Sequence, residues 1–172
     1  MSDELRSILP SVTVLGAAAA MAVFLTISRG WAAGGSKHIR GAVLVALLTV
    51  LGQAAHFTEE LLTGFDARFP ALLGLPPMSL RFFVTFNVAW LAIWSLCAWG
   101  LAARRRAALF PLWFLGIACI VNGIAHPALA LLAGGYFPGL VTSPIMGVLG
   151  VLLVRRLLVV TESPAFAPRS AT

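Results

Sequence analysis

Residues 41–63, GAVLVALLTVLGQAAHFTEELLT, form an apolar run with two adjacent carboxylates near its end. A membrane-spanning helix needs about 20 mostly apolar residues, and this run meets that requirement. A charged side chain at the centre of a bilayer is unfavourable by about 2.5–3.5 kcal/mol on insertion scales. The segment His56-Phe57-Thr58-Glu59-Glu60 is therefore expected to have a function that explains its presence in such a run.

The polar residues of this segment share one face of a helix. At about 100° per residue, Glu59 and Glu60 fall on either side of His56, about 60° one way and about 40° the other. One narrow face thus contains an imidazole and two carboxylates. This pattern predicts a site.

The composition of the whole chain is that of a membrane protein. Of its 172 residues, 60% are hydrophobic and 10% are charged, with a mean hydropathy of +0.97. A soluble domain is typically about 45–50% apolar and about a quarter charged. The net charge of +6 does not indicate a nucleic-acid partner, because the basic residues flank apolar segments. Cys97 and Cys119 lie inside apolar segments and are interpreted as small packing residues.

We predict an all-α bundle of five membrane-spanning helices. The expected spans are residues 12–28, 41–63, 81–103, 109–132 and 144–160. They form a single transmembrane domain over residues 1–162, followed by a disordered tail at residues 163–172. The Pro76-Pro77 pair excludes a continuous helix between the second and third spans, so a short surface helix or a reentrant turn is expected there.

Basic residues are distributed unequally between the two ends of these spans, and this asymmetry predicts an orientation. Eight lie in the first and third connections and near the C-terminal end of the last span: Arg29, Lys37, Arg40, Arg104, Arg105, Arg106, Arg155 and Arg156. The opposite ends have Arg6, Arg68 and Arg81, partly offset by acidic residues. The positive-inside rule then places the N-terminus outside and the C-terminus inside.

The polar motif is expected in the outer third of the membrane. At 1.5 Å per residue, His56 lies about 24 Å from Arg40 along the helix. Five polar residues from other segments are expected at this level or just above it: Asn87, Asn122, His126, Tyr136 and Thr142. Polar groups from several spans would then meet in one layer.

His56, Glu59, Glu60 and His126 are the predicted metal ligands. Neutral imidazole and carboxylate bind zinc and non-haem iron or manganese, and di-metal bundle proteins use a Glu-x-x-His pair with the same three-residue separation. Two alternatives remain open. One is acid/base chemistry without a metal, and the other is a structural network in which His56 and one glutamate form a pair that reduces the cost of burial.

Further roles follow from side-chain chemistry. Glu59, Glu60 and Tyr136 are the predicted catalytic residues. Four residues are predicted to bind substrate: Asn87, Asn122, Tyr136 and Thr142. For Tyr136 the alternative is an aromatic-belt residue in a Pro-Gly turn, and for Asn87 it is a helix–helix hydrogen bond. Pro127 lacks the backbone N–H that would bond to Gly123, which predicts a kink beside His126.

Three ordered motifs, His56-x-x-Glu59-Glu60, Asn122-x-x-x-His126 and Tyr136-x-Pro138-Gly139-x-x-Thr142, together resemble the signature of the HXXEE family. That family consists of small, largely prokaryotic integral membrane proteins of unsettled function. The resemblance implies a multi-pass protein of a prokaryotic inner membrane. It also implies that the family's polar residues correspond to seven positions here: His56, Glu59, Glu60, Asn122, His126, Tyr136 and Thr142.

The leading functional hypothesis is a metal-dependent membrane enzyme, a hydrolase or oxidoreductase, that acts on a lipid-like or isoprenoid substrate. Its cofactor would be a divalent metal, Zn²⁺ or iron, and access would be from the membrane lipid or from the extracytoplasmic side. One alternative is a metal-free isomerase or hydratase of an isoprenoid, in which a glutamate in apolar surroundings donates a proton to an alkene or carbonyl with His126 as its counterpart. A His/Glu cluster in a five-span bundle is also loosely analogous to the sterol-isomerase-like emopamil-binding fold. The other alternative is a small proton- or cation-coupled transporter, which with five spans would require a homo-oligomer.

Overall fold

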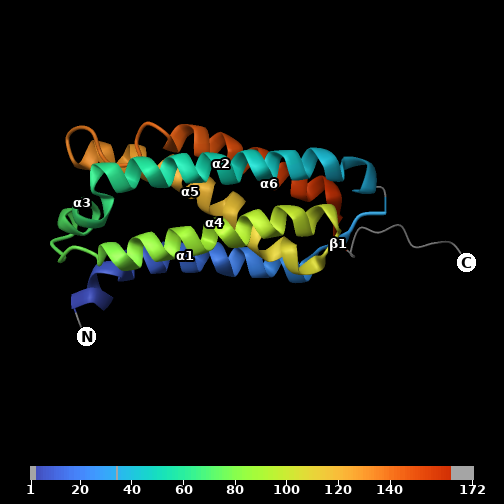
Figure 1. The fold of residues 1–172 in the computed structure, drawn as a ribbon, viewed down its shortest axis with the longest axis horizontal. Helices are drawn as coiled ribbons and strands as arrows, with labels where there is room; N and C mark the ends of the chain where they lie inside the picture. Colours follow the sequence, from blue (N-terminus) through green and yellow to red (C-terminus); the bar gives the residue numbers. More distant parts are fainter. Residues whose placement is uncertain (1–2, 34, 164–172) are drawn as a thin grey trace, which may run out of the picture.

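The computed structural model describes residues 3–33 and 35–163, and these form an elongated bundle of helices along one common axis (Figure 1). The elements in chain order are α1 (Asp3–Ser28), β1 (Gly30–Trp31), η1 (Gly35–His38), α2 (Ile39–Thr63), α3 (Phe65–Leu72), α4 (Leu80–Ala102), η2 (Arg106–Ala108), α5 (Leu109–Leu132), α6 (Ser143–Val160) and β2 (Thr161–Glu162). The predicted all-α class is confirmed, and the two strands are only two residues each.

Five of the helical segments are long and apolar enough to cross a membrane: α1, α2 with η1, α4, η2 with α5, and α6. The limits of α2, α4, α5 and α6 match the predicted spans within two residues, and only the first span differs by more. There α1 begins at Asp3 rather than at residue 12, and it continues through Pro10. Hydropathy marks only the apolar part of a helix, so the polar first turns were missed. The expected disordered tail, apart from residue 163, lies outside the described residues.

Helix α5, the fourth of the five long apolar helices, lies at the centre of the bundle. In the most apolar 18-residue stretch of α5, 56% of the residues are buried, compared with 11% in the corresponding stretch of α1, which lies at the periphery. Glycines allow α5 and α6 to approach closely, since a Cβ on Gly123 would lie 2.6 Å from Gly147 Cα and one on Gly150 would lie 2.6 Å from Gly116 O. The helix α5 continues through Pro127 to Leu132. His126 is therefore fixed against a tightly packed helix pair.

The short helix α3 confirms the surface helix expected between the second and third spans. A left-handed Gly64 (φ 76°) ends α2 and begins α3, so the chain turns sharply one residue after Thr63. The helix α3 lies at the same end of the bundle as the start of α1, and β2 lies at the opposite end (Figure 1).

The segment after α1 and the segment after α6 are joined at the basic end of the bundle by a pair of short strands and by Arg29, together called the clasp, which the sequence did not predict. Strands β1 and β2 pair antiparallel, with Trp31 opposite Thr161. Arg29 donates to Thr161 Oγ1 (3.0 Å), to Thr161 O (2.7 Å) and to Leu158 O (3.2 Å). A guanidinium at the C-terminus of α6 satisfies carbonyls that the helix leaves unbonded and interacts favourably with its dipole.

Replacing Arg29 with alanine is expected to lower the free energy of unfolding by about 1–3 kcal/mol, because three charge-assisted hydrogen bonds are lost. Chemical unfolding in mixed micelles measures this. Lys37→Ala, which removes an exposed cation at the same end of the bundle, is the matched control and should change stability little. Equal stability of the two variants would show that the clasp contributes nothing.

Candidate metal centre

Three buried side chains from two helices meet near one end of the bundle. His56 and Glu60 lie one turn apart on α2, and His126 projects from α5. Their exposed fractions are 0%, 6% and 2%. Glu60 Oε1 lies 3.6 Å from His56 Nε2 and 3.4 Å from His126 Nε2, and the two imidazole rings are 4.7 Å apart in an edge-on arrangement.

Both imidazoles have their protons on the side that faces away from Glu60. His126 Nδ1 lies 2.6 Å from the Pro138 carbonyl oxygen, which can only accept, so Nδ1 is the donor. The single hydroxyl proton of Thr142 goes to Glu59 Oε2 (2.6 Å), so Thr142 Oγ1 accepts from His56 Nδ1 (2.7 Å). In each neutral ring the lone pair is then on Nε2.

The lone pairs of the two Nε2 atoms and an oxygen of Glu60 thus point at one another, and none of these three atoms has a proton to donate in a hydrogen bond. The three ligand atoms lie within 4.8 Å of one another. The two N–O distances are longer than an N–H···O hydrogen bond of about 2.7–3.2 Å, and His56 Nε2 is buried without a hydrogen-bond partner among the described residues. Such a group needs a proton or a cation at its centre.

The distances from Glu60 to the two histidines suit a shared metal ion. Two bonds of about 2.1 Å at a tetrahedral angle separate their donor atoms by about 3.4 Å, close to the 3.4 and 3.6 Å found here. Metal-binding histidines generally donate their other ring N–H to a carbonyl or a carboxylate, which fixes the tautomer. Both histidines have such an arrangement, His126 directly and His56 through Thr142.

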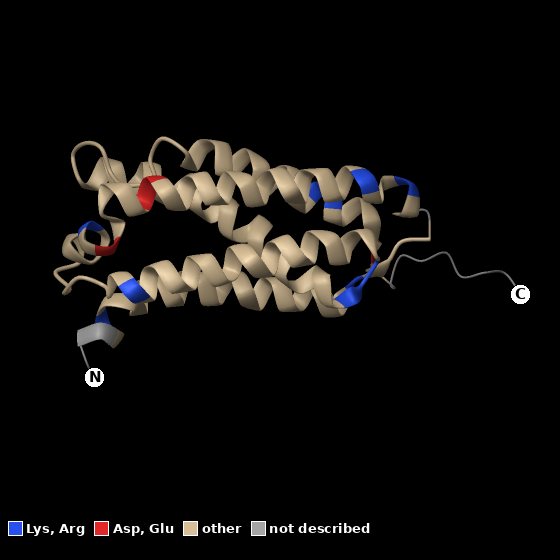
Figure 2. Cartoon of the chain, in the orientation of Figure 1, with Lys and Arg blue, Asp and Glu red and all other residues tan. Residues whose placement is uncertain are grey.

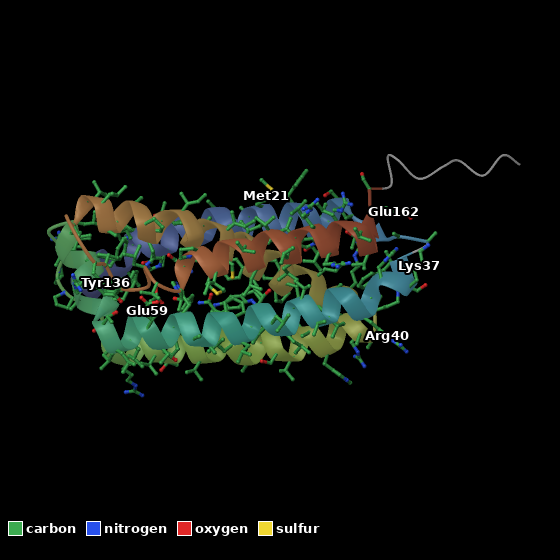
Figure 3. All side chains as sticks on the ribbon, turned by 90° about the horizontal axis from the view of Figure 1, so that it is seen from above. Met21, Lys37, Arg40, Glu59, Tyr136 and Glu162 are labelled. Atoms are coloured by element: carbon green, nitrogen blue, oxygen red, sulfur yellow. The ribbon has the colours of Figure 1, made fainter. Side chains whose placement is uncertain are left out.

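Glu59 lies outside this group and has different contacts. Its carboxylate accepts four hydrogen bonds from the loop after α5: Tyr136 OH (2.8 Å), Val141 N (3.0 Å), Thr142 N (2.9 Å) and Thr142 Oγ1 (2.6 Å). An ionised carboxylate can accept all four. Sequence reasoning included Glu59 among the metal ligands, but its contacts make it an anchor for the loop. Figure 3 shows Glu59 and Tyr136 side by side near one end of the bundle.

The loop backbone covers the two imidazoles directly. Gly139 has φ 83°, and a Cβ there would lie 2.5 Å from His126 Nδ1 and 2.8 Å from His56 Cε1. Two aromatic rings complete the cover, with Phe65 of α3 at 5.5 Å and Phe137 of the loop at 6.3 Å from the His126 ring. The centre is therefore shielded from water on the loop side.

Tyr136 lies at the edge of this cover, where 41% of the residue is exposed. Desolvation, together with the hydrogen bond to Glu59, raises the pKa of the Tyr136 phenol. The phenol therefore remains a donor at neutral pH. Arg68 of α3 donates to the Tyr136 carbonyl oxygen (2.9 Å), so the helix and the loop are joined on this side.

In the described part of the chain, the two asparagines predicted to bind substrate form no hydrogen bond with the histidines or the glutamates of the centre. Asn87 Nδ2 donates to Phe83 O of its own helix (2.9 Å), and in the described part of the chain it makes no polar contact with the centre. Asn122 lies one turn before His126 on α5, half-buried, and its side chain has no hydrogen-bond partner among the described residues. Of the predicted residues, the structure brings together His56, Glu59, Glu60, His126, Tyr136 and Thr142.

Sequence reasoning missed the contributions of the backbone. The Pro138 carbonyl bonds to His126, the Val141 and Thr142 N–H groups bond to Glu59, and Gly139 leaves no room for a Cβ beside the two histidines. A Pro-Gly pair between two polar motifs was a signal for Gly139, since such pairs mark turns with positive φ. Nothing in the sequence indicated the backbone groups.

A bundle with five membrane-type helices and a buried His/Glu/His group beneath a glycine-containing loop defines a class of polytopic helical protein with a potential metal centre. The chain belongs to the HXXEE family, whose model, described as a protein of unknown function with HXXEE motif, matches residues 42–154. His56, Glu59 and Glu60 supply the motif, and the predicted resemblance is confirmed. Comparison with curated proteins and with solved structures gave no match.

Proposed function

We propose that this protein is a membrane enzyme whose divalent metal ion is bound by His56, Glu60 and His126. The observation that supports the proposal most directly is the convergence of three acceptor atoms, with both Nδ1 protons held by outer hydrogen bonds. Two histidines and one carboxylate form the zinc site of several hydrolases and the iron site of many oxygenases. Zn²⁺ and Fe²⁺ are therefore the proposed metals.

The metal would act as a Lewis acid at an open coordination position. Residues of this chain would do the rest. The loop at Gly139, with Phe65 and Phe137, would exclude water from one side. The exposed Tyr136 phenol, whose proton is donated to Glu59, would accept a hydrogen bond from a substrate hydroxyl, and the unpaired amide of Asn122 would orient the substrate. Glu59 and Thr142 would hold the His56 ring in its metal-binding tautomer.

A lipid-like or isoprenoid substrate fits the position of the centre near one end of five apolar helices. The proposed location is a prokaryotic inner membrane, with the start of α1 outside and the basic end inside. Figure 2 shows most arginines and lysines at the end opposite to α3. The positive-inside rule supports this orientation.

Cysteine labelling tests the orientation. In intact cells, a membrane-impermeant thiol reagent is expected to label Leu73→Cys, at the α3 end, and to label Lys37→Cys only after lysis, because the two residues lie on opposite sides of the membrane. Both are exposed positions, whereas Cys97 and Cys119 lie within apolar helices. The reverse labelling pattern would show the opposite orientation.

Metal analysis tests the proposed centre. The purified protein is expected to contain about one equivalent of metal, and His56→Ala, His126→Ala and Glu60→Gln should each lose most of it, because two ligands hold a metal far less tightly than three. His38→Ala, which alters the one histidine away from the centre, is the matched control. Absence of stoichiometric metal, with the same content in His56→Ala, overturns the proposal.

A second candidate function is supported by the same unpartnered nitrogen. A proton at the centre, shared between Glu60 and His56 Nε2, would serve acid/base chemistry on an alkene or carbonyl without a metal. An isomerase or hydratase would then be the enzyme. Activity that survives exhaustive chelation but is lost in Glu60→Gln favours this function over the first.

A further inference from the structure

An open pocket lies at the α3 end of the bundle, outside the candidate metal centre. Its volume is about 240 Å³. Three elements line it: α3 through Arg68, Ala71 and Leu72, the residue after α5 through Ala133, and the loop through Phe137. Four of these five side chains are apolar, and Arg68 is the only charged one.

The Arg68 guanidinium is held at this pocket by contacts that use few of its hydrogen-bond donors. It donates to the Tyr136 carbonyl, and its Cζ lies 6.0 Å from the centroid of the Phe137 ring. In the part of the chain that the structure describes, no carboxylate lies within ion-pair distance of it, and the only ion pairs are those of Glu60. A guanidinium has five N–H donors in a fork that matches a carboxylate or a phosphate. Most of them remain available to a ligand.

Phe137 belongs both to the pocket wall and to the cover of the metal centre. Phe137 is 1% exposed, and its ring lies against both Phe65 and His126. Phe137 therefore contacts both the pocket and the His126 ring. The pocket therefore lies next to the metal centre, where a second part of a substrate would bind.

We propose that this pocket binds the oxyanion head of an anionic amphiphile, a carboxylate or phosphate attached to a hydrocarbon chain, and that Arg68 recognises the head. This inference rests on the proposed enzyme, for which it names the substrate class. A volume of about 240 Å³ is below the range of about 300–1,000 Å³ typical of sites that enclose a whole ligand. The pocket therefore holds the head and the first carbons.

The rest of the amphiphile's hydrocarbon chain, beyond the first carbons, has an exposed apolar surface of the protein to lie on. Leu131 and Leu132 directly precede Ala133 and are 84% and 79% exposed, and Leu72 on the other wall is 40% exposed. Leu72 is part of the pocket wall, and Leu131 and Leu132 add exposed apolar surface at the same end of α5 as Ala133. An anionic head beside Arg68 with its hydrocarbon chain over these leucines satisfies both the charge and the apolar surface.

Native mass spectrometry of the full chain released from micelles tests this, because one spectrum counts bound amphiphile and bound metal. The probes are hexadecanoate, hexadecyl phosphate, the neutral hexadecanol and inorganic phosphate. Hexadecanoate or hexadecyl phosphate should bind at one equivalent, and Arg68→Gln should weaken that binding about tenfold or more, as expected for loss of a charge-assisted contact. Arg68→Lys should bind at an intermediate level, and Arg81→Gln, an exposed arginine outside the pocket, is the matched control.

Each outcome decides the matter. Hexadecanol binding as tightly as hexadecanoate, or equal binding to Arg68→Gln and Arg81→Gln, overturns the role of Arg68. Inorganic phosphate binding as tightly as hexadecyl phosphate shows a free-anion site and overturns the amphiphile. Ala133→Trp, which fills the pocket without touching the charge, should also abolish binding. Arg68-dependent binding in a protein without metal would reject the proposed metal centre and leave this subsite, whereas metal without such binding would reject the subsite alone.

Discussion

Replacing Gly139 with alanine is expected to lower the free energy of unfolding by about 2–5 kcal/mol and to abolish metal binding. The positive φ of 83° is unfavourable for a residue with a Cβ by about 1–2 kcal/mol. The new Cβ would also lie 2.5–2.8 Å from atoms of both imidazoles, and overpacking of this kind costs about 1–3 kcal/mol. Because both rings must move, the Nε2 atoms no longer converge on Glu60.

Two other glycines of the same turn separate these effects. Gly134 also has a positive φ (69°), but a Cβ there has open space, so Gly134→Ala measures backbone strain alone. Gly135 has neither a positive φ nor a close neighbour, so Gly135→Ala should change little. Chemical unfolding and metal content are measured for all three variants. If Gly139→Ala behaves like Gly134→Ala in both measurements, the loop does not touch the histidines as described.

Removing the Glu59 carboxylate is expected to produce the second largest effect. Glu59→Ala leaves two backbone N–H groups and two hydroxyls of the loop without their acceptor, which should lower the free energy of unfolding by about 2–4 kcal/mol. The Thr142 hydroxyl is then free to donate to His56 Nδ1. That reversal puts the ring proton on Nε2, where it faces Glu60 and blocks the metal position. Metal affinity should fall about 10–100-fold, as is usual for loss of an outer-sphere partner.

Neighbouring residues supply the comparison for Glu59. Thr58→Ala removes a hydroxyl that is exposed and bonds only to Ala54 O of its own helix, so it should leave both quantities unchanged. Tyr136→Phe removes one of the four donors to Glu59 and should have a smaller effect than Glu59→Ala. Competition with a chelator gives the metal affinity. Wild-type affinity in Glu59→Ala, alongside loss of metal in Glu60→Gln, would contradict the role of Glu59 as the residue that sets the His56 tautomer.

The helices could be predicted from sequence with little error because hydropathy and helix breakers are local properties. The limits of α5 agree with the prediction at both ends, and those of α2, α4 and α6 agree within two residues. The start of α1 was placed too late, since polar first turns carry no hydropathy signal. The clasp at Arg29 could not be predicted, because its partners are residues 158 and 161, which are distant in sequence.

A similar depth for His56, Glu60 and His126 follows from the amino-acid sequence alone, because rise per residue and span limits set the level of each side chain along its helix. That Glu60, and not Glu59, faces the histidines depends on how the helices pack together. The two glutamates are adjacent, about 100° apart on the helix, and the rotation of α2 about its own axis selects between them. That rotation follows from packing against α4, α5 and α6 and from the loop that binds Glu59, and these contacts form only when the whole bundle is assembled.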